Sequence, residues 1–151
     1  MIEIEQVTEV SDELVQAFER LVPQLTAFSA PPTRADLEEM LSSRASSLLA
    51  ARPEPGGPIL GVLTLVIFRT PTGLHAWIED VVVEEGERRR GIGAALAQAG
   101  LERAARLGAK TVKLTSRPAR ESAIRLYQRL GFVRRNTDLY EYKFAEQKSE
   151  G

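Results

Sequence analysis

The feature that most constrains the fold is an apolar strand that leads directly into a glycine-opened helix. Residues 76–83 read Ala-Trp-Ile-Glu-Asp-Val-Val-Val, residues 84–87 form a short acidic turn, and residues 88–96 read Arg-Arg-Arg-Gly-Ile-Gly-Ala-Ala-Leu. The first amides of a helix have no internal hydrogen-bond partners, and the helix dipole is positive at that end. The pattern therefore predicts an anion site, for which phosphate is the usual occupant.

The composition is that of an ordinary globular domain and excludes several kinds of site. The chain has 151 residues, of which 43% are hydrophobic and 27% charged, enough for a substantial core. It has no cysteine, which excludes disulfides, thiolate metal ligands and a cysteinyl acyl-enzyme. Its one histidine, His75, argues against a histidine-built metal site, and we expect it to be a turn or surface residue with no metal bound.

The sequence predicts a cytoplasmic protein that does not enter a membrane. No stretch approaches the roughly 20 apolar residues that a membrane span needs. The first residues also lack the basic and then apolar pattern of a signal peptide. We expect one domain over residues 1–145, followed by a polar tail over residues 146–151.

The charges are divided unevenly along the chain, although the net charge is only -1. Residues 1–87 contain 5 basic and 15 acidic residues, whereas residues 88–135 contain 13 basic and 2 acidic residues. One interpretation is that the second half meets a polyanion and the first half faces a cationic molecule. The alternative is that the two halves attract each other.

The hydrophobic pattern predicts a mixed sheet with helices on both faces. Strands are expected at residues 2–5, 46–51, 59–68, 75–83, 110–115, 132–133 and 139–144. Helices are expected at residues 11–22, with Pro23 as the stop, and at 33–43, 91–107 and 119–130. The fold class is therefore α+β, with a six- to seven-stranded sheet, about four helices, and parallel crossovers on either side of the glycine-opened helix.

Three neighbours of the glycines favour a ligand site over simple close packing. Three arginines, residues 88–90, cluster where the helix amides point, and guanidinium groups are suited to phosphate. The strand before them ends in three valines whose main chain could meet an extended ligand. One crossover later, a helix adds Arg120, Arg125 and Arg129.

These motifs resemble those of the GCN5-related N-acetyltransferase (GNAT) family. Residues 88–93 resemble the family's R/Q-x-x-G-x-G/A signature, and residues 126–132, with Leu126-Tyr127 and Gly131-Phe132, resemble its C-terminal motif. Residues 78–83 resemble its splayed fourth strand. The match is strong over residues 59–135, and the order of elements fits the GNAT acyltransferase fold throughout.

The resemblance implies that acetyl-CoA binds in a gap between the fourth and fifth strands. Pantetheine would pair with the main chain of the valines, and the pyrophosphate would lie on the amides of the loop and helix start. The residues implied to bind acetyl-CoA are Val81, Val82, Val83, Arg88, Arg89, Arg90, Gly91, Ile92, Gly93 and Ala94. Ile124 stands where the family often has an asparagine that contacts coenzyme A, and its apolar side chain cannot make that hydrogen bond.

The implied reaction is transfer of an acetyl group from the thioester to a primary amine. By motif position, Tyr127 resembles the family's general acid, and the alternative is that it packs as core. Glu79 is the candidate base, and a structural salt bridge is its alternative role. Strand alternation places Glu79 on the side of Val81 and Val83, with Asp80 on the other side.

Other hypotheses stay open at this stage. The chain could be a sensor that binds coenzyme A without turnover, or a nucleic-acid or protein-binding domain that uses its basic half. The acceptor could be a small-molecule amine, a peptide lysine or a protein N-terminus. We expect acetyl-CoA and an amine as partners, no nucleic acid and no membrane, and a homodimer whose interface is formed by the last strands.

Overall fold

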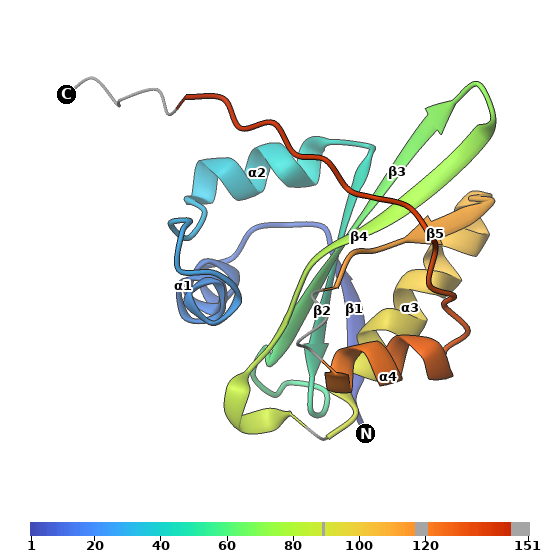
Figure 1. Ribbon diagram of the computed structural model, residues 1–151. Helices are drawn as coiled ribbons and strands as arrows, with labels where there is room; N and C mark the ends of the chain where they lie inside the picture. The colour runs from blue at the N-terminus through green and yellow to red at the C-terminus, as the bar shows by residue number, and fades with distance from the viewer. Residues whose placement is uncertain (89, 117–120, 146–151) are drawn as a thin grey trace.

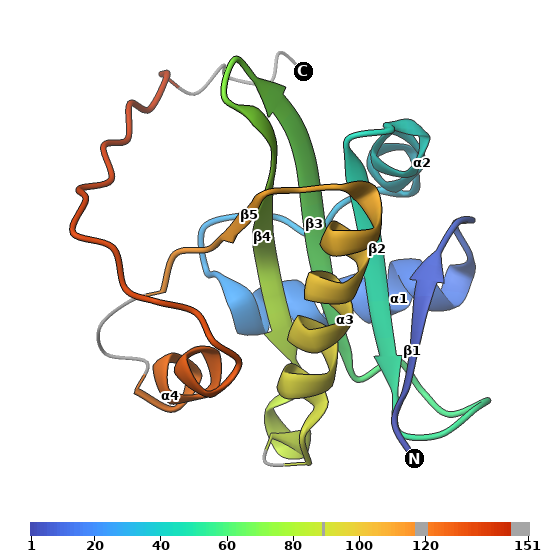
Figure 2. The same cartoon turned by 90° about the vertical axis from the view of Figure 1, so that its right-hand side faces the viewer.

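A five-stranded sheet with helices on both faces forms the body of the computed structural model, which describes residues 1–88, 90–116 and 121–145 (Figure 1). Helices α1 and α2 cover one face, and α3 and α4 lie on the other (Figures 1 and 2). No helix in the described ranges is long and apolar enough to cross a membrane. The elements in order are β1 (Glu3–Val7), α1 (Asp12–Leu25), α2 (Arg34–Ser42), β2 (Ser46–Arg52), β3 (Gly61–Thr70), β4 (Gly73–Val83), the 3-10 turn η1 (Glu85–Glu87), α3 (Ile92–Leu107), β5 (Thr111–Lys113) and α4 (Glu121–Arg129).

The strands lie in the order in which they occur in the sequence. The pairs β1–β2, β2–β3 and β3–β4 are antiparallel. Strand β5 is parallel to β4, because the chain returns to the same end of the sheet through α3. The predicted fold class is confirmed.

The helix boundaries follow local capping signals. The Ser11 hydroxyl accepts a hydrogen bond from the Leu14 amide at 3.1 Å, and Thr33 forms a reciprocal capping box with Asp36. Helix α1 continues past Pro23, where the sequence predicted its end. A proline in the last turn removes only one backbone hydrogen bond, and the Thr26 amide still closes the helix on Val22 at 3.0 Å.

Two hydrophobic layers fill the space between the sheet and the helices. Under α1 and α2, the buried residues include Leu14, Leu21, Leu37, Leu48 and Val62. Under α3, they include Leu63, Leu65, Ile78, Ile92 and Leu96. Successive strand residues alternate between the two layers, as period-two strands require.

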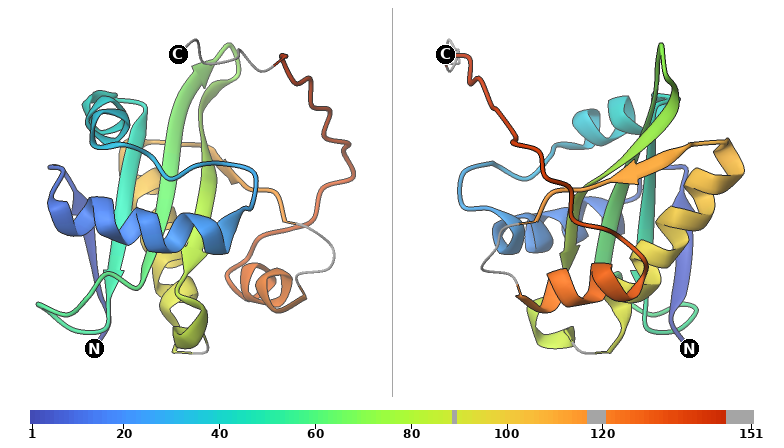
Figure 3. Two further views of the ribbon diagram at one scale, coloured as in Figure 1. Left: turned by 90° about the vertical axis from the view of Figure 1, so that its left-hand side faces the viewer. Right: turned by 45° about the vertical axis from the view of Figure 1, so that its right-hand side comes forward.

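The two strands expected at residues 132–133 and 139–144 are not formed, and this part of the prediction is wrong. Among the described residues the sheet ends at β5, and residues 133–145 run away from it as an extended arm (Figures 2 and 3). Large apolar side chains on the arm are 73–89% exposed, namely Val133, Leu139, Tyr140, Tyr142 and Phe144. Alternating apolar residues favour a strand, but a strand also needs a neighbour with which to pair, and the pattern cannot supply one.

We expect Leu63→Ala to lower the free energy of unfolding by about 2–5 kcal/mol, because the truncation leaves a cavity under α3. The Leu63 side chain is fully buried. The same substitution at Leu107, which is 42% exposed, is the matched control and should cost less than about 1 kcal/mol. Urea unfolding followed by the fluorescence of Trp77, the single tryptophan, measures both variants. Equal costs at the two positions would contradict this description of the core.

Candidate active site

Strand β4 carries a β-bulge at Asp80 and Val81. The register of β3 against β4 shifts between Val62 and Thr64, so that Leu63 lies opposite both bulge residues. Asp80 has a backbone φ of 49°, the one positive φ at a described residue other than glycine. Aspartate is among the residues that tolerate this conformation, and an inserted residue bends the strand and disrupts its ladder.

The bulge decides which face of the sheet each neighbouring residue occupies. Ile78, Val81 and Val83 all pack into the layer under α3. Glu79 is the register partner of Thr64 and lies with it on the opposite face, under α1 and α2. The prediction that Glu79 shares a side with Val81 and Val83 is therefore wrong, because the inserted residue reverses the alternation between them.

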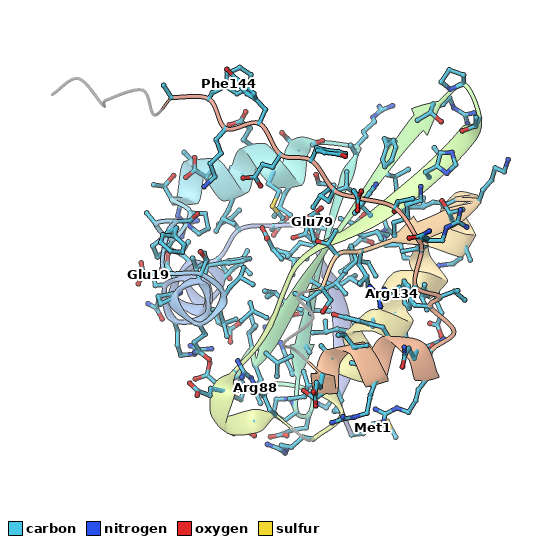
Figure 4. All side chains as sticks on the ribbon, in the orientation of Figure 1. Met1, Glu19, Glu79, Arg88, Arg134 and Phe144 are labelled. Carbon is cyan, nitrogen blue, oxygen red and sulfur yellow. The ribbon has the colours of Figure 1, made fainter. Side chains whose placement is uncertain are left out.

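Glu79 is an exposed carboxylate near the middle of β4 (Figure 4). No described lysine or arginine forms an ion pair with it, so the structure does not support its alternative role as a structural salt bridge. Partial burial raises the pKa of the Glu79 carboxyl, and the negative charge of Asp80 raises this pKa further. A raised pKa and the absence of a described cationic partner make this carboxylate a candidate to accept a proton.

Strands β4 and β5 pair briefly and then separate. Their parallel register covers three residue pairs and ends at Trp77 with Lys113. From Ile78 to Val83, β4 has no described partner strand on the β5 side, and Figure 2 shows the two strands diverging. Such a strand edge offers main-chain groups to an extended ligand. The gap lies where the sequence led us to expect pantetheine.

Helix α3 presents unsatisfied amides at its first turn. Gly91 precedes the helix with a φ of 81°, a conformation that glycine adopts without steric cost. The first helical hydrogen bond joins the Ala95 amide to the Gly91 carbonyl at 3.0 Å, which leaves the amides of residues 92–94 without partners inside the helix. The Ile92 side chain is buried in the core, so only the amide of this residue remains available to a ligand.

The start of α3 meets both the end of β4 and helix α4. A Cβ placed on Gly93 would lie 3.8 Å from Val83 Cγ2 and 3.6 Å from Leu126 Cδ2. The unsatisfied amides, the free edge of β4 and the helix that carries Tyr127 therefore come together in one region. These three features were predicted from the sequence as separate motifs.

The arginines next to this region differ in their surroundings. Arg88 is exposed on the loop that follows β4 (Figure 4). Arg90 forms an ion pair with Glu87 at 2.5 Å, which raises the pKa of its guanidinium. Arg89 lies outside the described residues, as do Arg120 and the tail over residues 146–151. Within the described ranges, Arg90–Glu87 is the one ion pair that joins the basic half to the acidic half, which gives little support to mutual attraction of the halves.

Two residues of α1 hold the beginning of this loop. Arg20 donates from Nε to the Glu84 carboxylate at 3.1 Å and from Nη2 to the Ile59 carbonyl at 2.6 Å. Gln24 donates to the same Glu84 carboxylate at 3.0 Å and accepts from the Glu85 amide at 2.8 Å. We name these four side-chain hydrogen bonds the α1 clamp. Sequence reasoning missed it, because Arg20 and Gln24 carry no motif and lie 60 or more residues from the loop in the sequence.

Helix α4 carries Tyr127 in a half-buried position. The Tyr127 ring packs edge-on against the Phe132 ring with centroids 5.7 Å apart, and the Phe132 amide donates to the Tyr127 carbonyl at 3.0 Å. Ile124 is also half-buried and has no polar group to offer a ligand. The stacking supports the packing role of the Tyr127 ring, and it does not exclude a chemical role for the hydroxyl.

A cavity of about 370 Å³ lies on the α1 and α2 face of the sheet, next to the bulge. Its walls come from α1, the loop that follows α1, the start of α2, and strands β3 and β4. Asp80 and Thr64 contribute to its floor. The described residues contain no group of three or more histidine, cysteine, aspartate or glutamate side chains that could hold a metal ion.

Known structures show the same fold over nearly the whole chain. An acetyltransferase from Trypanosoma brucei is 26% identical, with 95% of this chain and 100% of that chain covered and a TM-score of 0.75. An aminoglycoside acetyltransferase from an uncultured soil metagenomic sample is 25% identical, with 96% and 99% covered and a TM-score of 0.79. AAC(6')-Iy, solved in complex with the bisubstrate analog CoA-S-monomethyl-acetylneamine, is 19% identical, with 96% and 99% covered and a TM-score of 0.76.

A sequence profile of the acetyltransferase (GNAT) family matches residues 9–132. The match includes the bulge, the strand gap, the glycine-opened helix and Tyr127. It confirms the family that the sequence motifs resemble, whose members are acyltransferases that use acetyl-CoA. The chain belongs to the acetyltransferase (GNAT) family.

Proposed function

We propose that the protein is an acetyl-CoA-dependent N-acetyltransferase that acts on a primary amine, with residues 1–145 as its one domain. The observation that carries the proposal is the convergence of the free β4 edge, the unsatisfied α3 amides and α4 on one face of the sheet. The cavity lies on the other face of the same bulge. A thioester and an amine that approach the bulge from opposite faces can react there.

Binding of acetyl-CoA would use main-chain groups more than side chains. Pantetheine would pair with the main chain of Val81, Val82 and Val83, and the pyrophosphate would lie on the amides of Gly91, Ile92, Gly93 and Ala94. Arg88 and Arg90, with Arg89, would add positive charge around it. Ile124 cannot donate a hydrogen bond to coenzyme A, so the amides carry that part of the affinity.

The transfer forms a C–N bond and breaks the C–S bond of the thioester. The ammonium group of the acceptor, with a pKa near ~10, must first lose a proton, and Glu79 would accept it directly or through water. The amine lone pair then attacks the acyl carbon, and the Val81 amide is a candidate donor to its oxygen. Tyr127 would protonate the leaving thiolate, and the proton that the nitrogen loses as the amide forms would restore the Tyr127 hydroxyl.

Some expectations from the sequence stay predictions. The arm of residues 133–145 leaves large apolar side chains exposed, which suits a homodimer contact. Cytoplasmic location and the absence of nucleic-acid binding also stay predictions. A sensor that binds coenzyme A without turnover is the alternative in a different class, and the following measurement separates it from the enzyme.

We expect Tyr127→Phe to lower kcat by about 10²–10⁴-fold, the usual contribution of a general acid, while KM for acetyl-CoA changes little. Phenylalanine keeps the ring contact with Phe132, so packing alone predicts no loss. Tyr140→Phe on the exposed arm is the matched control. The rate of thiol release from acetyl-CoA gives kcat and KM for the wild type, Tyr127→Phe and Tyr140→Phe. Unchanged kcat in Tyr127→Phe would contradict the acid role, and no release with any amine class would favour the sensor.

The pH profile of kcat/KM should follow the carboxyl of Glu79. The Glu79 carboxyl becomes protonated as the pH falls through its raised pKa, and it can then no longer accept a proton. The value of kcat/KM should therefore rise as the pH increases through that pKa. Asp80→Asn removes the like charge but leaves the burial, so the pKa of Glu79 should fall and the acid limb should move to lower pH. Asp138→Asn, on the exposed arm, should leave the acid limb of the pH profile unchanged. A limb that does not move in Asp80→Asn would contradict the role of Glu79.

A further inference from the structure

The cavity beside the bulge has an apolar wall and, at Asp80, a carboxylate that forms no ion pair with a described residue. Its apolar lining includes Phe18, Val22, Leu25, Ala30 and Pro32. The polar lining residues are three hydroxyl side chains and two carboxylates, namely Thr26, Ser29, Thr64, Asp36 and Asp80. No lysine or arginine is among the described residues that line it. A negatively charged acceptor would find no partner in the cavity, whereas an acceptor with an apolar body would be desolvated favourably.

The two carboxylates in the lining are not equivalent. Asp36 lies at the start of α2, where its carboxylate accepts the Thr33 amide at 2.9 Å as part of the capping box. The Asp80 carboxylate accepts no hydrogen bond from any described residue, and Asp80 is the bulge residue next to Val81. The Asp36 carboxylate is therefore engaged in a hydrogen bond within the protein. The Asp80 carboxylate has no described partner, and it lies at the end of the cavity where acyl transfer is proposed.

The volume of the cavity limits the size of the acceptor. A volume of about 370 Å³ is at the low end for ligand pockets. A three-ring aminoglycoside and a linear polyamine both carry several ammonium groups, and either would place further charges against the apolar wall, where charge is costly.

We infer that the cavity binds the acceptor with its ammonium group at Asp80, and that the acceptor is a monoamine with a compact apolar body, an arylalkyl or short alkyl amine. This inference rests on the proposed acetyltransferase function. Glu79 on the same face remains the proton acceptor, while Asp80 positions the ammonium group. The aminoglycoside acetyltransferases share the fold with this chain, and the lining of its cavity favours a smaller and less polar acceptor.

Thiol release with 2-phenylethylamine, spermidine and an aminoglycoside tests the acceptor class. We expect kcat/KM for 2-phenylethylamine to exceed the other two values by about tenfold or more. Ala30→Asp adds a carboxylate to the apolar wall and should lower kcat/KM for 2-phenylethylamine about tenfold, with a much smaller effect on spermidine. Ala27→Asp is the matched control, because Ala27 is exposed in the same loop and is not part of the lining.

A binding measurement separates this inference from the proposed function. 2-Phenylethylamine is titrated into the protein with coenzyme A present, and the amide signals of Thr64 and Val82 are followed by NMR. Binding at these residues without thiol release would overturn the acetyltransferase and keep the cavity as an amine site. A preference for spermidine or the aminoglycoside would overturn the inference and keep the enzyme. Equal loss in Ala27→Asp and Ala30→Asp, or no binding at Thr64 and Val82, would also overturn the inference.

Discussion

One inserted residue in β4 is the constraint on which the rest of the site depends. Asp80 adopts a left-handed conformation, which costs a residue other than glycine about 1–3 kcal/mol unless its surroundings impose it. The insertion places Val81 under α3 and leaves Glu79 and Asp80 on the face of α1 and α2. An ordinary strand would place residues 79 and 81 on one face. The bulge therefore places the proposed thioester and amine sites on opposite faces of one strand.

Helix α1 contacts both regions, because it lines the cavity and its clamp holds the loop that follows β4. Helix α1 provides a wall of the cavity through Phe18 and Val22. The same helix uses Arg20 and Gln24 to hold the loop that leads to the α3 amides. Because one helix contacts both regions, it sets the distance between the cavity and the loop that leads to the proposed phosphate site. Precise placement of this kind is what catalysis by proximity requires.

Local sequence signals predicted the parts of the fold that local chemistry controls. The helix starts near Ser11 and Thr33, the glycine-opened start of α3 and the long strands were all predicted from the sequence, since each depends on a few neighbouring residues. The family motifs also located the gap in the sheet and the helix that follows it. This agreement covers most of the region in which the acetyl-CoA site is proposed.

What the sequence could not predict depends on residues far apart or on an insertion. Alternation placed Glu79 beside Val81, because a pattern of period two carries no mark of an extra residue. Three of the four hydrogen bonds of the α1 clamp join residues 60 or more positions apart, without a motif at either end. The alternating arm at residues 139–144 has the composition of a strand, but pairing depends on a partner edge. Such features follow from tertiary packing, which a single sequence does not encode locally.

The most direct test of the central claim is a titration of coenzyme A into isotope-labelled protein, followed through the backbone amide signals. If the β4 edge and the α3 start form the site, the largest shifts should occur at Val81, Val83 and residues 91–94. Amides of the hairpin loop around Gly56 and of the arm should stay unchanged. Shifts confined to the arm or to the loop, or no shifts at saturating coenzyme A, would contradict the account.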